Sequence, residues 1–91
     1  MKALNHFLAQ MELERLLSFT LDRLDTFLSD DTQRRTTFTF NVHYVTVDKD
    51  TNLVTVLPEF FFEIPEESLD IASFSEAIKH KISHQNQDIS S

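Results

Sequence analysis

The chain has 91 residues, with no Cys, Gly or Trp, and a formal net charge of −7 at pH 7. This length supports one compact domain, residues 1–91, and the missing cysteines exclude disulfide frameworks, thiolate zinc sites and iron–sulfur clusters. The negative charge disfavours direct binding of nucleic acid or an anionic membrane, and no stretch has the apolar length of a transmembrane helix, so we expect a cytoplasmic protein.

Residues 3–28 predict one long helix, because they contain no Gly or Pro and are rich in Leu, Glu and Arg. Its apolar residues form two stripes that are offset around the helix axis. The first stripe consists of Leu4, Phe7, Leu8 and Met11, and the second of Leu13, Leu17, Leu21, Leu24, Phe27 and Leu28. Either the helix is straight and packs on two different bodies, or it bends without a cue in the sequence. The straight helix is the simpler alternative, so we interpret the first stripe as a candidate contact with a second copy of the chain.

Residues 36–64 alternate between apolar and polar, which predicts a long antiparallel β-hairpin. The apolar residues occupy even positions in both halves, and residues 48–52 between them have the composition of a turn. With Val47 opposite Leu53, all apolar even residues share one face. The predicted cross-strand pairs are Tyr44–Val56, Val42–Pro58, Phe40–Phe60 and Phe38–Phe62.

A hairpin of two strands is marginally stable by itself, and we find no third strand in the sequence. Pro58 has no N–H to donate, which places it at a sheet edge or at a bend. We therefore expect the hairpin to be completed to a four-stranded sheet by homodimerisation.

Residues 70–83 predict a second helix, started by Asp70 as an N-cap or by Ser73 and Glu76 as a capping box. The polar residues 84–91 are expected to form a frayed tail. The predicted fold class is α+β with the order α-β-β-α, in which a long hairpin is flanked by two helices.

Residues 48–76 carry eight acidic residues against Lys49 alone, which accounts for the whole net charge of the chain. This uneven distribution of charge favours a basic partner. The alternative interpretation is that these residues form a solvated, acid-rich surface without a partner. Phe61 points away from the core face in the predicted hairpin, where exposure of its ring to water is unfavourable unless a helix or a partner covers it. The candidate partner-binding residues are Glu59, Phe61, Glu63, Glu66, Glu67 and Asp70.

One pattern resembles a calcium-binding loop, with Asp48, Asp50, Asn52 and Glu59 at its first, third, fifth and twelfth positions. Leu53 stands where such a loop needs Gly, and the flanking residues alternate as strands rather than forming helices. We therefore interpret the Asp and Asn residues as turn formers.

His80 and His84 lie four residues apart on the second predicted helix, so they share a face and could coordinate one metal ion. No third ligand has a matching spacing, and we interpret both as solvated surface residues. We assign no metal and no cofactor to the chain.

The sequence has no nucleophile paired with a base in a known arrangement, so we do not expect an enzyme. The expected function is a small acidic protein-binding module that recognises a basic protein surface. Inhibitors, immunity or antitoxin proteins, anti-defence proteins and chaperones share such surfaces, and the sequence does not separate them. The alternatives are a metal- or small-ligand-binding module and an inhibitor that mimics nucleic acid.

Overall fold

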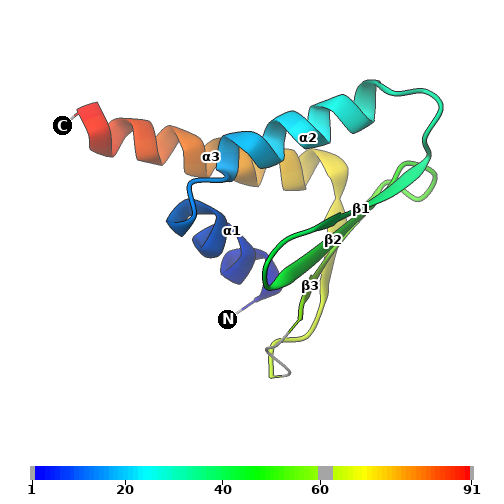
Figure 1. Ribbon diagram of the computed structural model, residues 1–91, viewed down its shortest axis with the longest axis horizontal. Helices are drawn as coiled ribbons and strands as arrows, with labels where there is room; N and C mark the ends of the chain where they lie inside the picture. The colour runs from blue at the N-terminus through cyan, green and yellow to red at the C-terminus, as the bar shows by residue number, and fades with distance from the viewer. Residues whose placement is uncertain (1, 60–62, 91) are drawn as a thin grey trace.

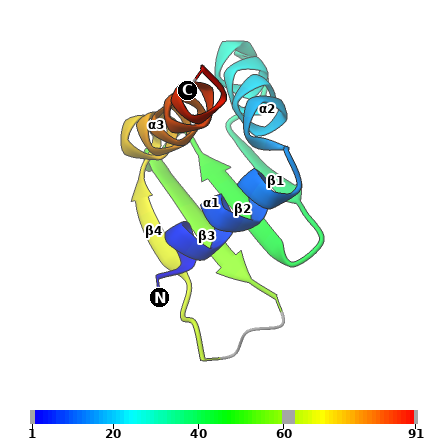
Figure 2. The ribbon, with the colours of Figure 1, turned by 90° about the vertical axis from the view of Figure 1, so that its left-hand side faces the viewer.

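A computed structural model describes residues 2–59 and 63–90, with side chains up to residue 84. The elements in chain order are α1 (Ala3–Leu13), α2 (Leu17–Ser29), β1 (Arg35–Thr39), β2 (His43–Asp48), β3 (Leu53–Pro58), β4 (Glu67–Asp70) and α3 (Ile71–Ser90). The strands form one antiparallel sheet in the order β1-β2-β3-β4. The three helices lie on one face of it, with α2 and α3 side by side (Figure 1 and Figure 2). The α+β class is confirmed.

Two helices replace the single helix predicted for residues 3–28. The chain turns where Arg15 adopts a φ of 60°, in the left-handed region. The N–H of Leu16 then donates to the carbonyl of Met11 at 2.8 Å, which closes the end of α1 in a Schellman arrangement. Because of this turn, most residues of both apolar stripes face the same core instead of two separate bodies, although Leu13 and Leu28 of the second stripe are exposed.

The predicted hairpin of residues 36–64 is two consecutive hairpins. The N–H of Phe40 donates to the carbonyl of His43 at 2.9 Å, so the chain reverses at Asn41 and Val42. This turn shifts the pattern by one residue, and the core-facing residues of β2 are therefore the odd ones. The apolar even residues of β3 do face the core, as predicted.

The register of the central strand pair differs from the prediction by one residue. Val45 lies opposite Val56 and Val47 lies opposite Val54, whereas the sequence pattern placed Tyr44 opposite Val56. The two-residue turn before β2 causes this difference, because it brings the odd face of that strand to the core. The predicted partners at positions 60 and 62 lie outside the described residues.

Residues 67–70 form a fourth strand, β4, although the sequence pattern assigned them to a loop and the start of a helix. It pairs with β3, placing Val54 opposite Leu69. The central hairpin is therefore flanked on both sides by strands of its own chain. The sheet reaches four strands without a second copy, which removes the reason for expecting homodimerisation.

The last helix, α3, begins at Ile71 directly after Asp70, close to the predicted start. It continues through Ser90, although residues 84–91 were expected to be a frayed tail. Residues 84–90 contain no Gly or Pro that would end the helix.

One apolar core lies between the helices and the sheet. Its buried members are Ala3, Phe7, Leu8, Met11, Leu17, Leu24, Phe27, Val45, Val47, Val54, Val56, Phe74 and Ile78. Among the described residues, no helix covers the other face of the sheet (Figure 1). A row of hydroxyl side chains crosses that open face, one from each strand: Thr37, Thr46, Thr55 and Ser68. The fold thus exposes the strand edges and the open face of the sheet.

Candidate functional site

Glu63 and Glu66 are exposed on the segment that leads into β4, at the end of the sheet away from α2 and α3 (Figure 2). The ion pairs within the described residues join Arg34 to Asp50 and Lys79 to Glu76, so neither of these two carboxylates takes part in one. Both carboxylates are therefore exposed to solvent without an ion pair in the described part of the chain. The neighbouring candidate Phe61 lies outside the described residues.

Glu67, another predicted partner-binding residue, holds the start of α1. Its Oε1 accepts a hydrogen bond of 3.0 Å from the N–H of Leu4, and its side chain is half-buried. The residue preceding α1, Lys2, makes no side-chain cap. A carboxylate from β4 therefore satisfies an otherwise unpaired N–H and lies at the positive end of the helix dipole.

Asp70 caps the start of α3, as the sequence pattern predicts for this residue. Its two carboxylate oxygens accept hydrogen bonds from the N–H and the hydroxyl of Ser73, at 2.9 and 2.6 Å. The hydrogen bond from the Ser73 hydroxyl, with that from its N–H, lowers the pKa of Asp70 below its ordinary value. Although Asp70 is exposed, its carboxylate already has a structural task.

Glu59 is half-buried beside the sheet and accepts a hydrogen bond of 2.9 Å from the hydroxyl of Tyr44. This hydrogen bond raises the pKa of Tyr44, because loss of the phenolic proton would bring two negative charges together. Glu59 therefore adds negative charge next to the segment that carries Glu63, although its carboxylate already accepts the hydrogen bond from Tyr44.

The first apolar stripe, interpreted as a candidate dimer contact, packs inside its own chain. Phe7, Leu8 and Met11 are buried in the core, and Leu4 is half-buried against it. A buried side chain offers no surface to a second copy. The offset of this stripe reflects the turn between α1 and α2, and contacts within one chain account for its burial.

The segment that resembles a calcium loop forms the turn between β2 and β3. Oδ1 of Asp48 accepts a hydrogen bond of 2.9 Å from the N–H of Asp50, and Oδ1 of Asp50 pairs with Arg34 at 2.8 Å. Asn52 adopts a left-handed φ of 56°, which Asn tolerates better than most residues. These contacts agree with the interpretation of the residues as turn formers.

His80 and His84 stack edge to face on α3, with their ring centroids 4.3 Å apart. Both are exposed. Across the described residues, no group of three or more His, Asp or Glu side chains is arranged to hold a metal ion.

A second histidine pair lies between α1 and β2 and does not follow from the sequence pattern. His6 Nδ1 and His43 Nε2 are 2.8 Å apart, and the His43 ring packs edge-on against Phe7. His43 is buried, and its Nδ1 has no hydrogen-bond partner in the described part of the chain. Burial, with a smaller effect from His6, lowers the pKa of His43 to about 4, although nearby Glu14 acts in the opposite direction.

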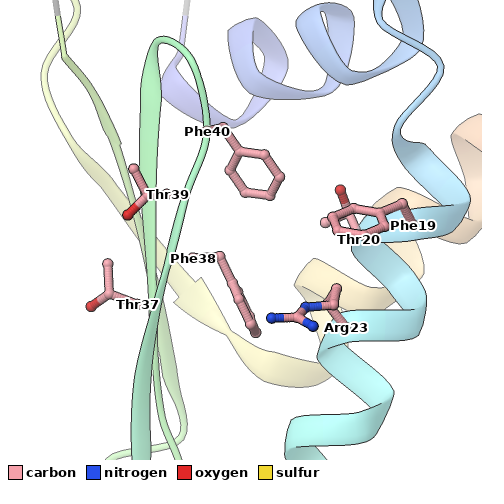
Figure 3. Close-up of a pocket in the computed structure, with 7 residues that line it drawn as sticks. All are labelled: Phe19, Thr20, Arg23, Thr37, Phe38, Thr39 and Phe40. Atoms are coloured by element: carbon pink, nitrogen blue, oxygen red, sulfur yellow. The ribbon is translucent and has the colours of Figure 1, made fainter.

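A groove between α2 and β1 is the other feature that the sequence reading missed. Figure 3 shows Phe38 of β1 and Phe40, directly after β1, pointing toward α2, where Phe19 and Arg23 approach them. These four side chains, with Thr20, Thr37 and Thr39, line a hollow of about 160 Å³. A second hollow of about 180 Å³ also borders Arg23 and Phe38, so the two are neighbours along the strand.

One signal for this groove exists in the sequence. Phe19 belongs to neither apolar stripe of the predicted helix, and Arg23 lies four residues after it on the same side. An aromatic residue outside the core stripe indicates a second contact surface. The structure leaves Phe19 52% exposed, which agrees with that interpretation.

No family model matches the chain, and no curated protein or solved structure matches it either. Within the described residues, no helix has both the length and the apolar character needed to cross a membrane.

Proposed function

We propose that this protein is a small non-enzymatic binding module that recognises a basic surface of another protein. The supporting observation is that Glu63 and Glu66 are exposed on one short segment and take no part in the ion pairs of the described residues. Like charges on one segment produce a local negative field that attracts Lys- and Arg-rich surfaces. Glu59 and Glu67 flank the segment and extend the same sign of charge.

The contact depends mainly on Glu63 and Glu66, because the other acidic candidates have tasks within the fold. Glu67 binds the first turn of α1, and Asp70 binds the first turn of α3. Solvated charges at the rim of an interface chiefly steer association and set its salt dependence. Inhibitors, immunity or antitoxin proteins, anti-defence proteins and chaperones are the classes of module that use such a surface.

The test compares two double variants that carry the same change of net charge. Glu63→Lys/Glu66→Lys reverses the proposed contact, and Asp22→Lys/Asp25→Lys reverses two exposed acids of α2. Each protein is immobilised and used to capture partners from a native lysate, which are identified by mass spectrometry. The wild type and the α2 variant are expected to retain the same basic protein, while the Glu63/Glu66 variant loses it.

Capture by the wild type should also weaken steeply when the salt concentration rises from about 50 to about 300 mM, because exposed charges are screened over this range. Equal capture by both double variants would show that the acidic segment is not the contact. Circular dichroism spectra of the variants check that each remains folded.

A further inference from the structure

The edge of the sheet farthest from Glu63 and Glu66 is formed by β1, and a groove runs beside it. We propose that this edge and groove bind an extended peptide, which adds a fifth strand to the sheet and places an Asp or Glu side chain at Arg23. This site is separate from the acidic segment and goes beyond the function proposed above.

The backbone of β1 supports strand addition. The carbonyl of Arg34 accepts from Lys49 N–H, and the N–H of Phe40 donates to His43, so the even residues of β1 bond to β2. In an antiparallel pair the alternate residues point their N–H and C=O groups the other way. Arg35, Thr37 and Thr39 are exposed, and within residues 2–59 and 63–90 no further strand lies beyond them in the sheet. Such an edge is a template for an incoming strand.

The two hollows lie next to each other beside β1, where alternate side chains of an added strand would lie. They meet at Arg23 and Phe38, one continuing toward Phe19 and Phe40 and the other toward Phe27. Alternate side chains of a strand point to the same face and lie about 7 Å apart. One side chain of the peptide can therefore lie at Arg23 while the side chains two residues before and after it enter the hollows. The first hollow, which borders Phe19, Phe38 and Phe40, favours an apolar side chain. The second hollow borders mostly polar residues and admits a polar side chain; these residues are Thr26, Asp30, Gln33 and Thr36.

The positive charge of Arg23 determines which peptide side chain is preferred at the central position. Arg23 is exposed, its guanidinium lies 5.9 Å from the ring centroid of Phe19, and the ion pairs of the described residues do not include it. The acid that borders the second hollow, Asp30, accepts hydrogen bonds from the N–H and hydroxyl of Thr32. A carboxylate is the group that pairs best with a guanidinium, because two parallel hydrogen bonds form. The preferred ligand therefore has an acidic side chain two residues away from an apolar one.

The probe is the synthetic peptide acetyl-Thr-Leu-Thr-Glu-Thr-Leu-Thr-amide, titrated into isotope-labelled protein and followed by amide NMR. We expect saturable shifts centred on Arg35, Thr37 and Thr39. Replacing the central Glu of the peptide by Lys should weaken binding about tenfold or more, since a charge-assisted hydrogen bond is lost. Arg23→Gln should reduce binding of the Glu peptide to the same extent, while Lys79→Gln, which removes one exposed cation from α3, should leave it unchanged.

A backbone variant tests the strand addition itself. The N–H of Thr37 points outward, so Thr37→Pro removes one edge donor without removing a hydrogen bond to β2. We expect Thr37→Pro to lose peptide binding and Thr37→Val to keep it; if Thr37→Pro does not fold, the Arg23→Gln comparison decides.

Three results would overturn the proposal, and none of them bears on the acidic segment. They are equal affinity for the Glu and Lys peptides, amide shifts centred away from β1, and a self-association of the protein that Thr37→Pro abolishes. The last result would assign the edge to a second copy of the chain.

Discussion

At the scale of single residues, His43 makes the stability of the fold sensitive to acid. It faces His6 and Phe7 of α1 and lies near Glu14, and protonation would bury a charge and a second N–H whose nitrogen has no partner in the described structure. Because the pKa of His43 is lowered from 6.5 to about 4, the unfolded chain takes up this proton first as the pH falls. The free energy of unfolding should therefore decrease between pH 6.5 and pH 4, by about 3 kcal/mol from this residue.

Urea unfolding at a series of pH values between about 7 and about 4 measures this effect. His43→Leu removes the titrating group, so its free energy of unfolding should fall less with acid than that of the wild type. His84→Leu changes an exposed histidine and should follow the wild type, while the carboxylates contribute equally to all three proteins. Parallel pH curves for His43→Leu and the wild type would contradict the assignment.

At the scale of elements, the turn between α1 and α2 shows where sequence patterns were informative and where they were not. The two offset stripes are visible in the sequence, yet no Gly or Pro marks a helix end between them. Arg15 takes the left-handed conformation that usually requires Gly, at a cost of about 1–2 kcal/mol. Burying most of both stripes in one core outweighs this local cost, which propensity reasoning along a single helix does not include.

Arg15→Gly should therefore stabilise the protein by about 1 kcal/mol, because Gly adopts a positive φ without the clash of a Cβ atom. Thermal unfolding followed by circular dichroism measures the change. The same substitution at Arg23, in the interior of α2, should instead destabilise by about 1 kcal/mol, since Gly is a poor helix former. A loss of stability in Arg15→Gly would mean that the arginine side chain itself holds the turn.

Features that depend on neighbouring residues could be predicted from the sequence, whereas features that depend on residues far apart in the chain could not. The cap at Asp70 and the turn after Asp48 depend on neighbouring residues and could be predicted. The reversal at Asn41 lacks Gly or Pro, and β4 has a single large apolar residue, Leu69, so neither gives a local signal. The cap that Glu67 supplies to α1 joins residues 63 positions apart and required the folded structure.

At the scale of the whole molecule, Phe7 joins the three parts of the fold. Its ring centroid lies 5.2 Å from that of Phe40 on the β1–β2 turn, 5.3 Å from His43 and 5.9 Å from Phe74 of α3. Removing such a ring costs about 3–5 kcal/mol, against a total stability of roughly 5–15 kcal/mol for a domain. Phe7→Ala should thus loosen helices and sheet together rather than detach α1 alone.

Urea unfolding with two probes tests this expectation, because circular dichroism reports the helices and Tyr44, the only Tyr in a chain without Trp, reports the sheet by fluorescence. Both transitions of Phe7→Ala should move to lower urea by the same amount, while Phe19→Ala, at a ring that is 52% exposed, should change stability by less than about 1 kcal/mol. The loss should also be the same across about a hundredfold range of protein concentration, since a core contact is intramolecular. A loss that depends on concentration would instead place Phe7 in a contact between two copies of the chain.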